Sequence, residues 1–144
     1  MKLISCFLLT LFLSKGCVNQ PKQDFSKSTV TYTAETRGYY MQIILANNTL
    51  SISKDRETRL PSVQVPLSKE QQKKVLSYLK AIDVANLAQL KAPTEKRFYD
   101  GAAIGNLSIS HKGETYGTSG FDHGNPPVEI EQLVTFMNAF DKSE

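Results

Sequence analysis

Four side chains of this 144-residue sequence could carry acid–base catalysis or hold a metal ion: His111, His123, Asp100 and Asp122. Histidine changes its charge near neutral pH and is a common metal ligand, and a carboxylate beside it can act as its partner. These two histidines are the only ones in the sequence. The four residues predict a small hydrolase or a metal-dependent enzyme only if the fold brings them together.

The spacing of these residues argues against such a site. Asp122 and His123 are neighbours in sequence, so in an extended segment their side chains point in opposite directions. The sequence contains neither a His-x-x-x-His pair nor a cysteine pattern with metal-ligand spacing. Aspartate commonly bonds to local backbone, so we expect Asp122 to stabilise a turn and His123 to lie in a loop before the last helix. We therefore expect no catalytic residue, no metal and no cofactor.

Segment 91–101 is the part of the chain that ordinary fold patterns explain least. It reads as a long loop with two aromatic and five charged side chains. Loops carry binding functions more often than the strands they connect. We expect the part of this loop from Arg97 to Asp100, together with the loop from Phe121 to Asn125, to form a surface for a ligand or partner. The candidate residues of this surface are Arg97, Tyr99, Asp100, Asp122, His123 and Asn125.

The N-terminal segment has the parts of an export signal in order. Lys2 supplies a short positive start, segment 3–13 is apolar, and Ser14-Lys15-Gly16-Cys17 follows. The apolar run is too short to cross a bilayer as a helix. This arrangement resembles the type II (lipobox) signal peptide of bacterial lipoproteins. The resemblance implies that residues 1–16 are a removed signal peptide and that Cys17 is the lipid-attachment residue.

The lipobox departs from the usual pattern at Ser14 and Lys15, because leucine commonly stands three places before the cysteine. An uncleaved N-terminal anchor or an ordinary secretory signal is the alternative. Segment 18–27 is polar and shows no periodicity, which predicts that residues 17–27 form a lipidated flexible tether. Within the lipoprotein resemblance, Val18 in place of aspartate implies sorting to the outer membrane, facing the periplasm, rather than retention in the inner membrane.

Removal of the signal changes the charge balance of the chain. Residues 1–16 contain two lysines and no acidic residue, so Lys+Arg falls from 17 to 15 against 14 Asp+Glu, and the net charge falls from +3 to +1. A near-neutral chain lacks the clustered cations that nucleic-acid binding requires, so we expect no nucleic-acid partner. With Cys6 removed and Cys17 acylated, no cysteine remains for a disulfide or a zinc site.

Alternating apolar residues predict strands in the first half of the chain. Segments 29–35, 39–46 and 49–54 alternate with period two, and Thr36-Arg37-Gly38 and Asn47-Asn48 provide the turns between them. These segments predict a three-stranded antiparallel meander. Segment 63–67 also alternates but lies among prolines, which predicts an edge strand or an extended loop.

Two helices and a second hairpin are expected in the rest of the chain. Ser68 and Gln71 form a capping box that predicts a helix ending near Ile82, followed by a short helical turn. Segments 102–110 and 114–119, joined by Lys112-Gly113, predict a C-terminal hairpin. A last helix follows the prolines at 126–127, with an apolar face. The expected fold class is α+β: one domain, 28–144, with an antiparallel sheet of meander and hairpin packed by two helices.

The order of strands, helix, hairpin and helix, with Tyr99-Asp100-Gly101-Ala102 and the Phe121-Asp122-His123-Gly124-Asn125-Pro126-Pro127 stretch, resembles small uncharacterised lipoproteins of the Bacteroidetes type. The resemblance implies fold and location but no activity. We therefore expect a lipid-anchored cell-envelope protein that acts as a non-enzymatic binding or interaction module. Its expected partners are the membrane, through its lipid, and an envelope protein or small ligand. The alternatives are a small envelope hydrolase or metal-dependent enzyme, and an inhibitor or immunity protein that blocks an enzyme entering the periplasm.

Overall fold

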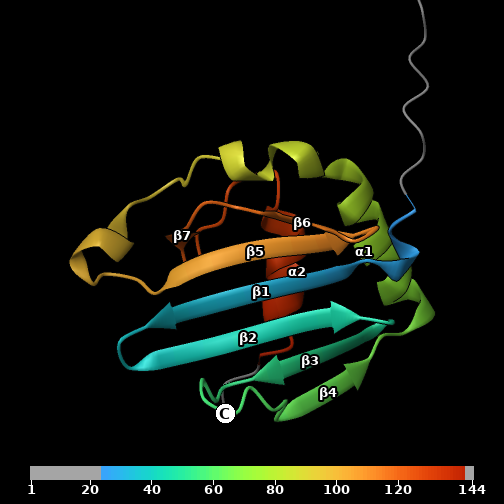
Figure 1. Ribbon diagram of the computed structural model, residues 1–144, viewed down its shortest axis with the longest axis horizontal. Helices are drawn as coiled ribbons and strands as arrows, with labels where there is room; N and C mark the ends of the chain where they lie inside the picture. The colour runs from blue at the N-terminus through green and yellow to red at the C-terminus, as the bar shows by residue number, and fades with distance from the viewer. Residues whose placement is uncertain (1–23, 142–144) are drawn as a thin grey trace, which may run out of the picture.

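Seven antiparallel strands form one sheet in the computed structural model, which describes residues 24–141 (Figure 1). Six strands lie in the order β4-β3-β2-β1-β5-β6, and β7 pairs with the start of β5. The predicted α+β fold with an antiparallel sheet is confirmed. The strands are β1 (Thr29–Thr36), β2 (Tyr39–Ala46), β3 (Thr49–Ser53), β4 (Val63–Pro66), β5 (Ile104–His111), β6 (Glu114–Gly117) and β7 (Phe121–Asp122).

Pairing between β1 and β5 joins the N-terminal meander to the C-terminal hairpin. Its register runs from Thr29 opposite Ser110 to Glu35 opposite Ile104. The meander and the hairpin were both predicted, but this long-range pairing and the short strand β7 were not. Because β7 pairs only with Ile104 and Gly105, it places Phe121 and Asp122 beside the beginning of β5.

Two of the tight hairpin turns, β2–β3 and β5–β6, have positive φ at both central residues. Asn47 and Asn48 have φ values of 49° and 60°, and Lys112 and Gly113 have φ values of 51° and 84°. This backbone matches the twist of two-residue hairpins, and asparagine and glycine tolerate it best. The predicted turns at 47–48 and 112–113 are therefore confirmed.

The first long helix, α1 (Lys69–Ala81), begins with the predicted capping box. The Ser68 hydroxyl accepts the N–H of Gln71 at 3.2 Å, and the Gln71 side chain accepts the N–H of Ser68 at 2.8 Å. These two bonds satisfy donors that a helix end would otherwise leave free. Two short 3-10 helices follow, η2 (Val84–Gln89) and η3 (Lys96–Tyr99).

The last helix, α2 (Glu131–Asn138), begins later than the prolines suggested. A proline restricts the residue before it to extended backbone, so Pro126 cannot open a helix when Pro127 follows it. A turn comes first, in which the Ile130 N–H donates to the Pro127 carbonyl at 3.1 Å. The apolar face of α2 is nevertheless buried as expected, through Leu133, Val134 and Met137.

The folded body begins earlier than the predicted domain boundary. The short 3-10 helix η1 (Phe25–Lys27) is capped by Asp24, whose side chain accepts the Ser26 N–H at 3.0 Å. Phe25 is buried in the core. The prediction that the tether extends to Lys27 is therefore wrong. The predicted signal peptide and Cys17 lie outside the described residues.

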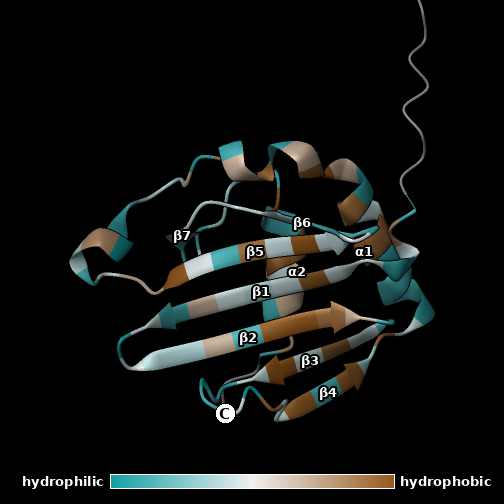
Figure 2. Cartoon of the chain, viewed as in Figure 1, coloured by the Kyte–Doolittle hydropathy of each residue, from teal (hydrophilic) through white to brown (hydrophobic). Residues whose placement is uncertain are grey.

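One face of the sheet carries the hydrophobic core, and α2 lies behind β1 and β5 in Figure 1. Along β1, Val30, Tyr32 and Ala34 are buried, while Thr31 and Thr33 alternate with them on the open face. Hydrophobic residues also make up much of β2, β3 and β4 (Figure 2). Within residues 24–141, neither α1 nor α2 is long and apolar enough to span a bilayer.

Candidate functional site

Asp122 is the centre of an anchor that ties β7 to loop 91–101. Its side chain is fully buried. One carboxylate oxygen, Oδ2, accepts the Thr94 hydroxyl at 2.5 Å and the Lys96 N–H at 2.7 Å. The other, Oδ1, accepts the Arg97 N–H at 3.0 Å and the Arg97 guanidinium at 3.1 Å. One carboxylate therefore fixes the backbone and side chains of a segment that lies far from it in sequence.

The environment keeps Asp122 ionised. Burial by itself raises the pKa of a carboxyl, but hydrogen bonds from Thr94, from the Arg97 and Lys96 amides and from the Arg97 guanidinium outweigh that effect. The pKa of Asp122 therefore lies well below its usual range. The Arg97 side chain is only 11% exposed, and its guanidinium also donates to the Thr94 carbonyl at 2.7 Å. The ion pair is thus largely desolvated, and its carboxylate accepts four hydrogen bonds, which offset the cost of burying the charge.

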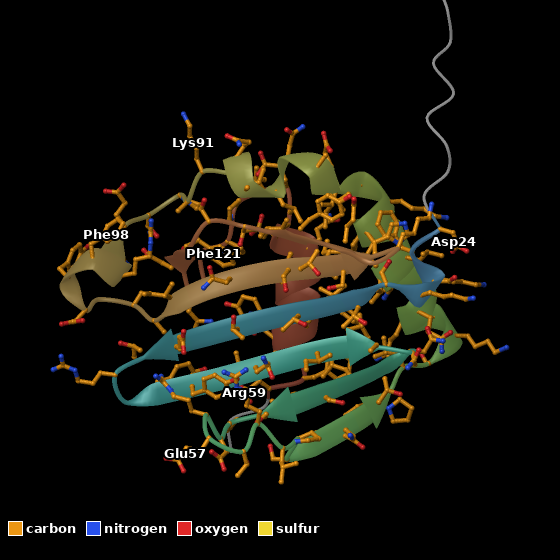
Figure 3. The ribbon with its side chains drawn as sticks, viewed as in Figure 1. Asp24, Glu57, Arg59, Lys91, Phe98 and Phe121 are labelled. Atoms are coloured by element: carbon orange, nitrogen blue, oxygen red, sulfur yellow. The ribbon has the colours of Figure 1, made fainter. Side chains whose placement is uncertain are left out.

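Above this anchor, η3 presents two aromatic rings to solvent. Phe98 is 72% exposed and Tyr99 is 71% exposed. The Arg97 guanidinium lies 4.3 Å from the centre of the Phe98 ring, within the range of a cation–π contact. We call η3 together with Asp100 the aromatic tip. Figure 3 shows Phe98 at one extreme of the molecule, projecting away from the sheet.

The end of η3 is closed by backbone geometry that its sequence favours. Asp100 has a φ of 58°, and the Gly101 N–H donates to the Lys96 carbonyl at 2.8 Å. A side chain at position 101 would place its Cβ 3.0 Å from a Tyr99 ring carbon and 3.2 Å from the Lys96 carbonyl oxygen. Glycine is therefore required for the close approach of Gly101 to the aromatic tip.

His123 points away from the anchor, as its position next to Asp122 predicted. Its Nδ1 lies 2.7 Å from the Tyr32 hydroxyl, and its ring lies 5.8 Å from the Tyr39 ring. Burial lowers the pKa of His123 and raises the pKa of Tyr32 to about 12. Both groups are therefore neutral at pH 7, and a neutral imidazole can accept the tyrosine hydroxyl proton in a hydrogen bond. His123 is half-buried and braces the end of β1.

The structure divides the other predicted surface residues into two groups. Tyr99, Asp100 and Asn125 are exposed. Asp122 is fully buried and Arg97 nearly so, and the prediction that these two belong to the surface is wrong. They neutralise each other and hold the loop rather than face a partner.

Phe98 lay within the predicted surface loop but was not among its named candidate residues, and Thr94 was missed altogether. The signal for Phe98 was its place in a polar, charged segment with no alternating apolar neighbour, which gives the ring no core face to join. Thr94 carried no signal, because its hydroxyl meets a carboxylate 28 residues away.

The two histidines lie at opposite ends of β5. His111 is its last residue, whereas the His123 N–H donates to the carbonyl of Ala103, just before the strand begins. Eight strand residues span roughly 25 Å. The convergence that an enzyme based on these histidines would require is therefore absent. Among residues 24–141, no group of three or more His, Cys, Asp or Glu side chains is placed to hold a metal ion.

His111 instead makes a contact between η1 and the sheet. Its Nδ1 lies 2.8 Å from the Ser28 hydroxyl, and its ring lies 5.0 Å from the Phe25 ring. The other ring nitrogen, Nε2, is buried without a hydrogen-bond partner in the described part of the chain. A serine nucleophile needs a base that is itself oriented by a third group. Among residues 24–141 no such group bonds to His111, and the Ser28–His111 contact joins η1 to the sheet.

Comparisons with known proteins provide no relative whose function could be considered for this chain. The chain matches no protein-family model, and neither a curated protein nor a solved structure is significantly similar to it.

Proposed function

We propose that this protein is a lipid-anchored cell-envelope protein that binds a protein partner through its aromatic tip and has no catalytic activity of its own. The observation that carries the proposal is the exposure of two adjacent aromatic rings above a buried, ion-paired anchor. Isolated apolar residues on a surface are common, but Phe98 and Tyr99 are consecutive and both are more than 70% exposed.

Aromatic residues are enriched where proteins bind one another, and tyrosine in particular dominates binding energy when it fills a partner's pocket. Binding costs less when the contacting residues are ordered beforehand. The bonds from Asp122 to Lys96 and Arg97 fix η3 in this way. The aromatic tip therefore has the chemistry and the order of a binding surface.

The position of the aromatic tip fits a chain that is anchored at its N-terminus. Asp24, the first described residue, lies at one end of the sheet, and Phe98 lies at the other (Figure 3). A lipid on Cys17 would hold the Asp24 end near a bilayer, so the aromatic rings would point away from it. The partner of the aromatic tip is then a protein of the envelope rather than the membrane that holds the lipid.

The proposed lipid attachment at Cys17 is tested by examining the mature N-terminus. The full chain is expressed in a bacterium that has the lipoprotein export machinery. Mass spectrometry of membrane-fraction material should find a chain that begins at Cys17 and carries diacylglycerol. A Cys17→Ser variant should lose this modification and remain unprocessed. Soluble wild-type material that begins at Met1 without lipid would contradict the proposal.

The binding surface is tested with a photo-crosslinking amino acid placed at position 98 of the full chain in living cells. Position 128 is a matched control, because Val128 is 75% exposed but lies outside the aromatic tip. We expect a discrete protein adduct from position 98 and none from position 128. Tyr99→Ser should reduce the adduct about tenfold or more, since loss of one central aromatic contact is worth a decade of affinity.

The same variants separate binding from folding. Phe98→Ser and Tyr99→Ser remove exposed rings, so the free energy of unfolding should change by no more than about 0.5 kcal/mol. Equal adducts from positions 98 and 128, or none from position 98, would show that the aromatic tip is not the binding surface.

A further inference from the structure

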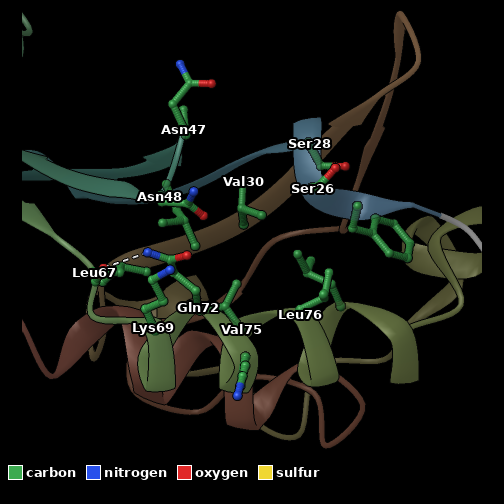
Figure 4. A pocket seen from close by; sticks show the side chains of 15 residues that line it. Ser26, Ser28, Val30, Asn47, Asn48, Leu67, Lys69, Gln72, Val75 and Leu76 are labelled. Carbon is green, nitrogen blue, oxygen red and sulfur yellow. Dashed lines mark hydrogen bonds between the residues drawn. The ribbon is translucent and has the colours of Figure 1, made fainter.

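An apolar cleft of about 320 Å³ lies at the end of the molecule opposite the aromatic tip. It runs between α1 and the sheet, and the β2–β3 turn closes one side. Val30 and Val75 face each other across it, and Leu67 and Leu76 extend the apolar wall (Figure 4). This volume is at the lower end of the range for small-molecule sites.

The rim of the cleft carries charge of one sign. Lys69 and Lys73 are the only charged residues among the fifteen that line it, and both are exposed. The nearest acidic residue on this turn of α1, Glu70, forms an ion pair with Lys74 at 3.4 Å, outside the lining. The two lysines also follow the N-terminal end of α1, where the helix dipole adds positive potential.

Amide groups complete the rim beside these lysines. Asn47 and Asn48 lie at the tip of the β2–β3 turn, and Gln72 rises toward them from α1 (Figure 4). The Gln72 amide already donates to the Leu67 carbonyl at 2.8 Å, which leaves its oxygen free to face the cleft. The cleft thus combines an apolar interior with a cationic, hydrogen-bonding mouth.

We propose that this cleft binds a free single-chain fatty acid, with the hydrocarbon chain against the apolar lining of the cleft and the carboxylate at Lys69 and Lys73. Transfer of the hydrocarbon chain from water to the apolar wall drives binding. The carboxylate stays at the exposed mouth, so it keeps most of its hydration while the lysines attract it. This inference does not depend on the aromatic tip or on the lipid at Cys17.

The test uses cells that produce the full chain, broken without detergent. The probe is a palmitate analogue with a photoreactive diazirine near its methyl end, and labelled peptides are identified by mass spectrometry. We expect label on peptides that carry Val30, Leu45 or Leu76. Excess palmitate should abolish the label, and excess hexadecanol, which has the same chain without the charge, should compete at least about fivefold less well.

Charge reversal at the rim tests the carboxylate contact. The double variant Lys69→Glu, Lys73→Glu should reduce labelling about fivefold or more, because two attractive contacts become repulsive. Lys80→Glu is the control, since it reverses one charge of α1 away from the cleft and should label like the wild type. All three lysines are exposed, so these variants keep the fold.

Four results would overturn the proposal. Label outside the cleft peptides would show that the fatty acid does not bind in the cleft. Equal competition by hexadecanol would show that the cleft does not prefer an anion. Equal labelling of the double variant and of Lys80→Glu would show that Lys69 and Lys73 do not bind the carboxylate. Stronger labelling of Cys17→Ser than of the wild type would show instead that the protein's own acyl chain occupies the cleft.

Discussion

Replacement of Asp122 by asparagine is expected to lower the melting temperature by about 10 °C or more and to release the aromatic tip from the sheet. Asparagine keeps the volume but loses the charge and one acceptor oxygen. Its NH₂ group would then face the Lys96 N–H, or the Arg97 N–H and guanidinium, and these groups can only donate. The Arg97 guanidinium would also remain buried without its counter-ion, and removal of one partner of a buried ion pair is strongly destabilising.

Asp100→Asn is the matched control for Asp122→Asn. It makes the same chemical change within the aromatic tip, at an exposed residue whose φ of 58° suits asparagine as well as aspartate. Calorimetry should therefore show a loss for Asp122→Asn and almost none for Asp100→Asn. Amide hydrogen exchange at Lys96 and Arg97 should accelerate only in the first variant. Equal melting temperatures in the two variants would show that the Asp122 carboxylate does not hold the loop.

The effect of Asp122 also depends on pH with a definite sign. Its pKa is lower in the folded state than the value near 4 of an unfolded chain, so its stabilisation is present above about pH 4 and is lost as the pH falls toward the folded pKa. The difference in melting temperature between the wild type and Asp122→Asn should therefore shrink between about pH 5 and pH 2. A constant difference over that range would contradict a buried, ionised Asp122.

The parts of this fold that depend on neighbouring residues could be predicted from the sequence. The asparagine turn at 47–48 requires only that asparagine tolerates positive φ, and the capping box requires only Ser68 and Gln71 at the right spacing. The period of two in β1 determined which residues are buried, because adjacent side chains of a strand point to opposite faces. Each of these features is decided within a few residues.

The site depends on contacts that no local pattern contains. Asp122 was expected to bond nearby backbone, and its own carbonyl does accept the Asn125 N–H. The carboxylate instead bonds residues 25 to 28 positions earlier, because the pairing of β7 with β5 brings β7 beside the loop. A strand of two residues has too little periodicity to be recognised in a sequence. Without the pairing of β7 with β5, neither the burial of Asp122 nor the role of Arg97 could be predicted.

The strand pairing that positions Asp122 depends on Gly105, so Gly105→Ala is expected to destabilise the protein by about 1–3 kcal/mol. A methyl group at this position would lie 2.9 Å from a ring carbon of Phe121 and 3.1 Å from the Tyr32 hydroxyl oxygen. Both rings are fully buried and stack on each other with centres 6.2 Å apart, so neither can move away freely. Thermal and urea unfolding measure the loss.

Gly117→Ala provides the control, because Gly117 is also a strand glycine but its nearest contact for an added methyl group is 3.8 Å away. We expect a change within about 0.5 kcal/mol there. Phe121→Leu should partly rescue Gly105→Ala, since a smaller side chain at 121 makes room for the methyl group, and the double-mutant cycle should give a coupling of about 0.5–3 kcal/mol. Additive effects would show that Phe121 does not limit the space at Gly105.

The same variant connects the core to the aromatic tip. Gly105 lies opposite Phe121 in the β5–β7 register, and Ile104 lies opposite Asp122 in the next pair. A methyl group that displaces Phe121 therefore displaces β7, and with it the carboxylate that holds Lys96. Gly105→Ala should accelerate exchange of the Lys96 amide, and Phe121→Leu in the same chain should slow it again. Unchanged exchange in a destabilised Gly105→Ala protein would mean that the anchor holds the aromatic tip independently of β7.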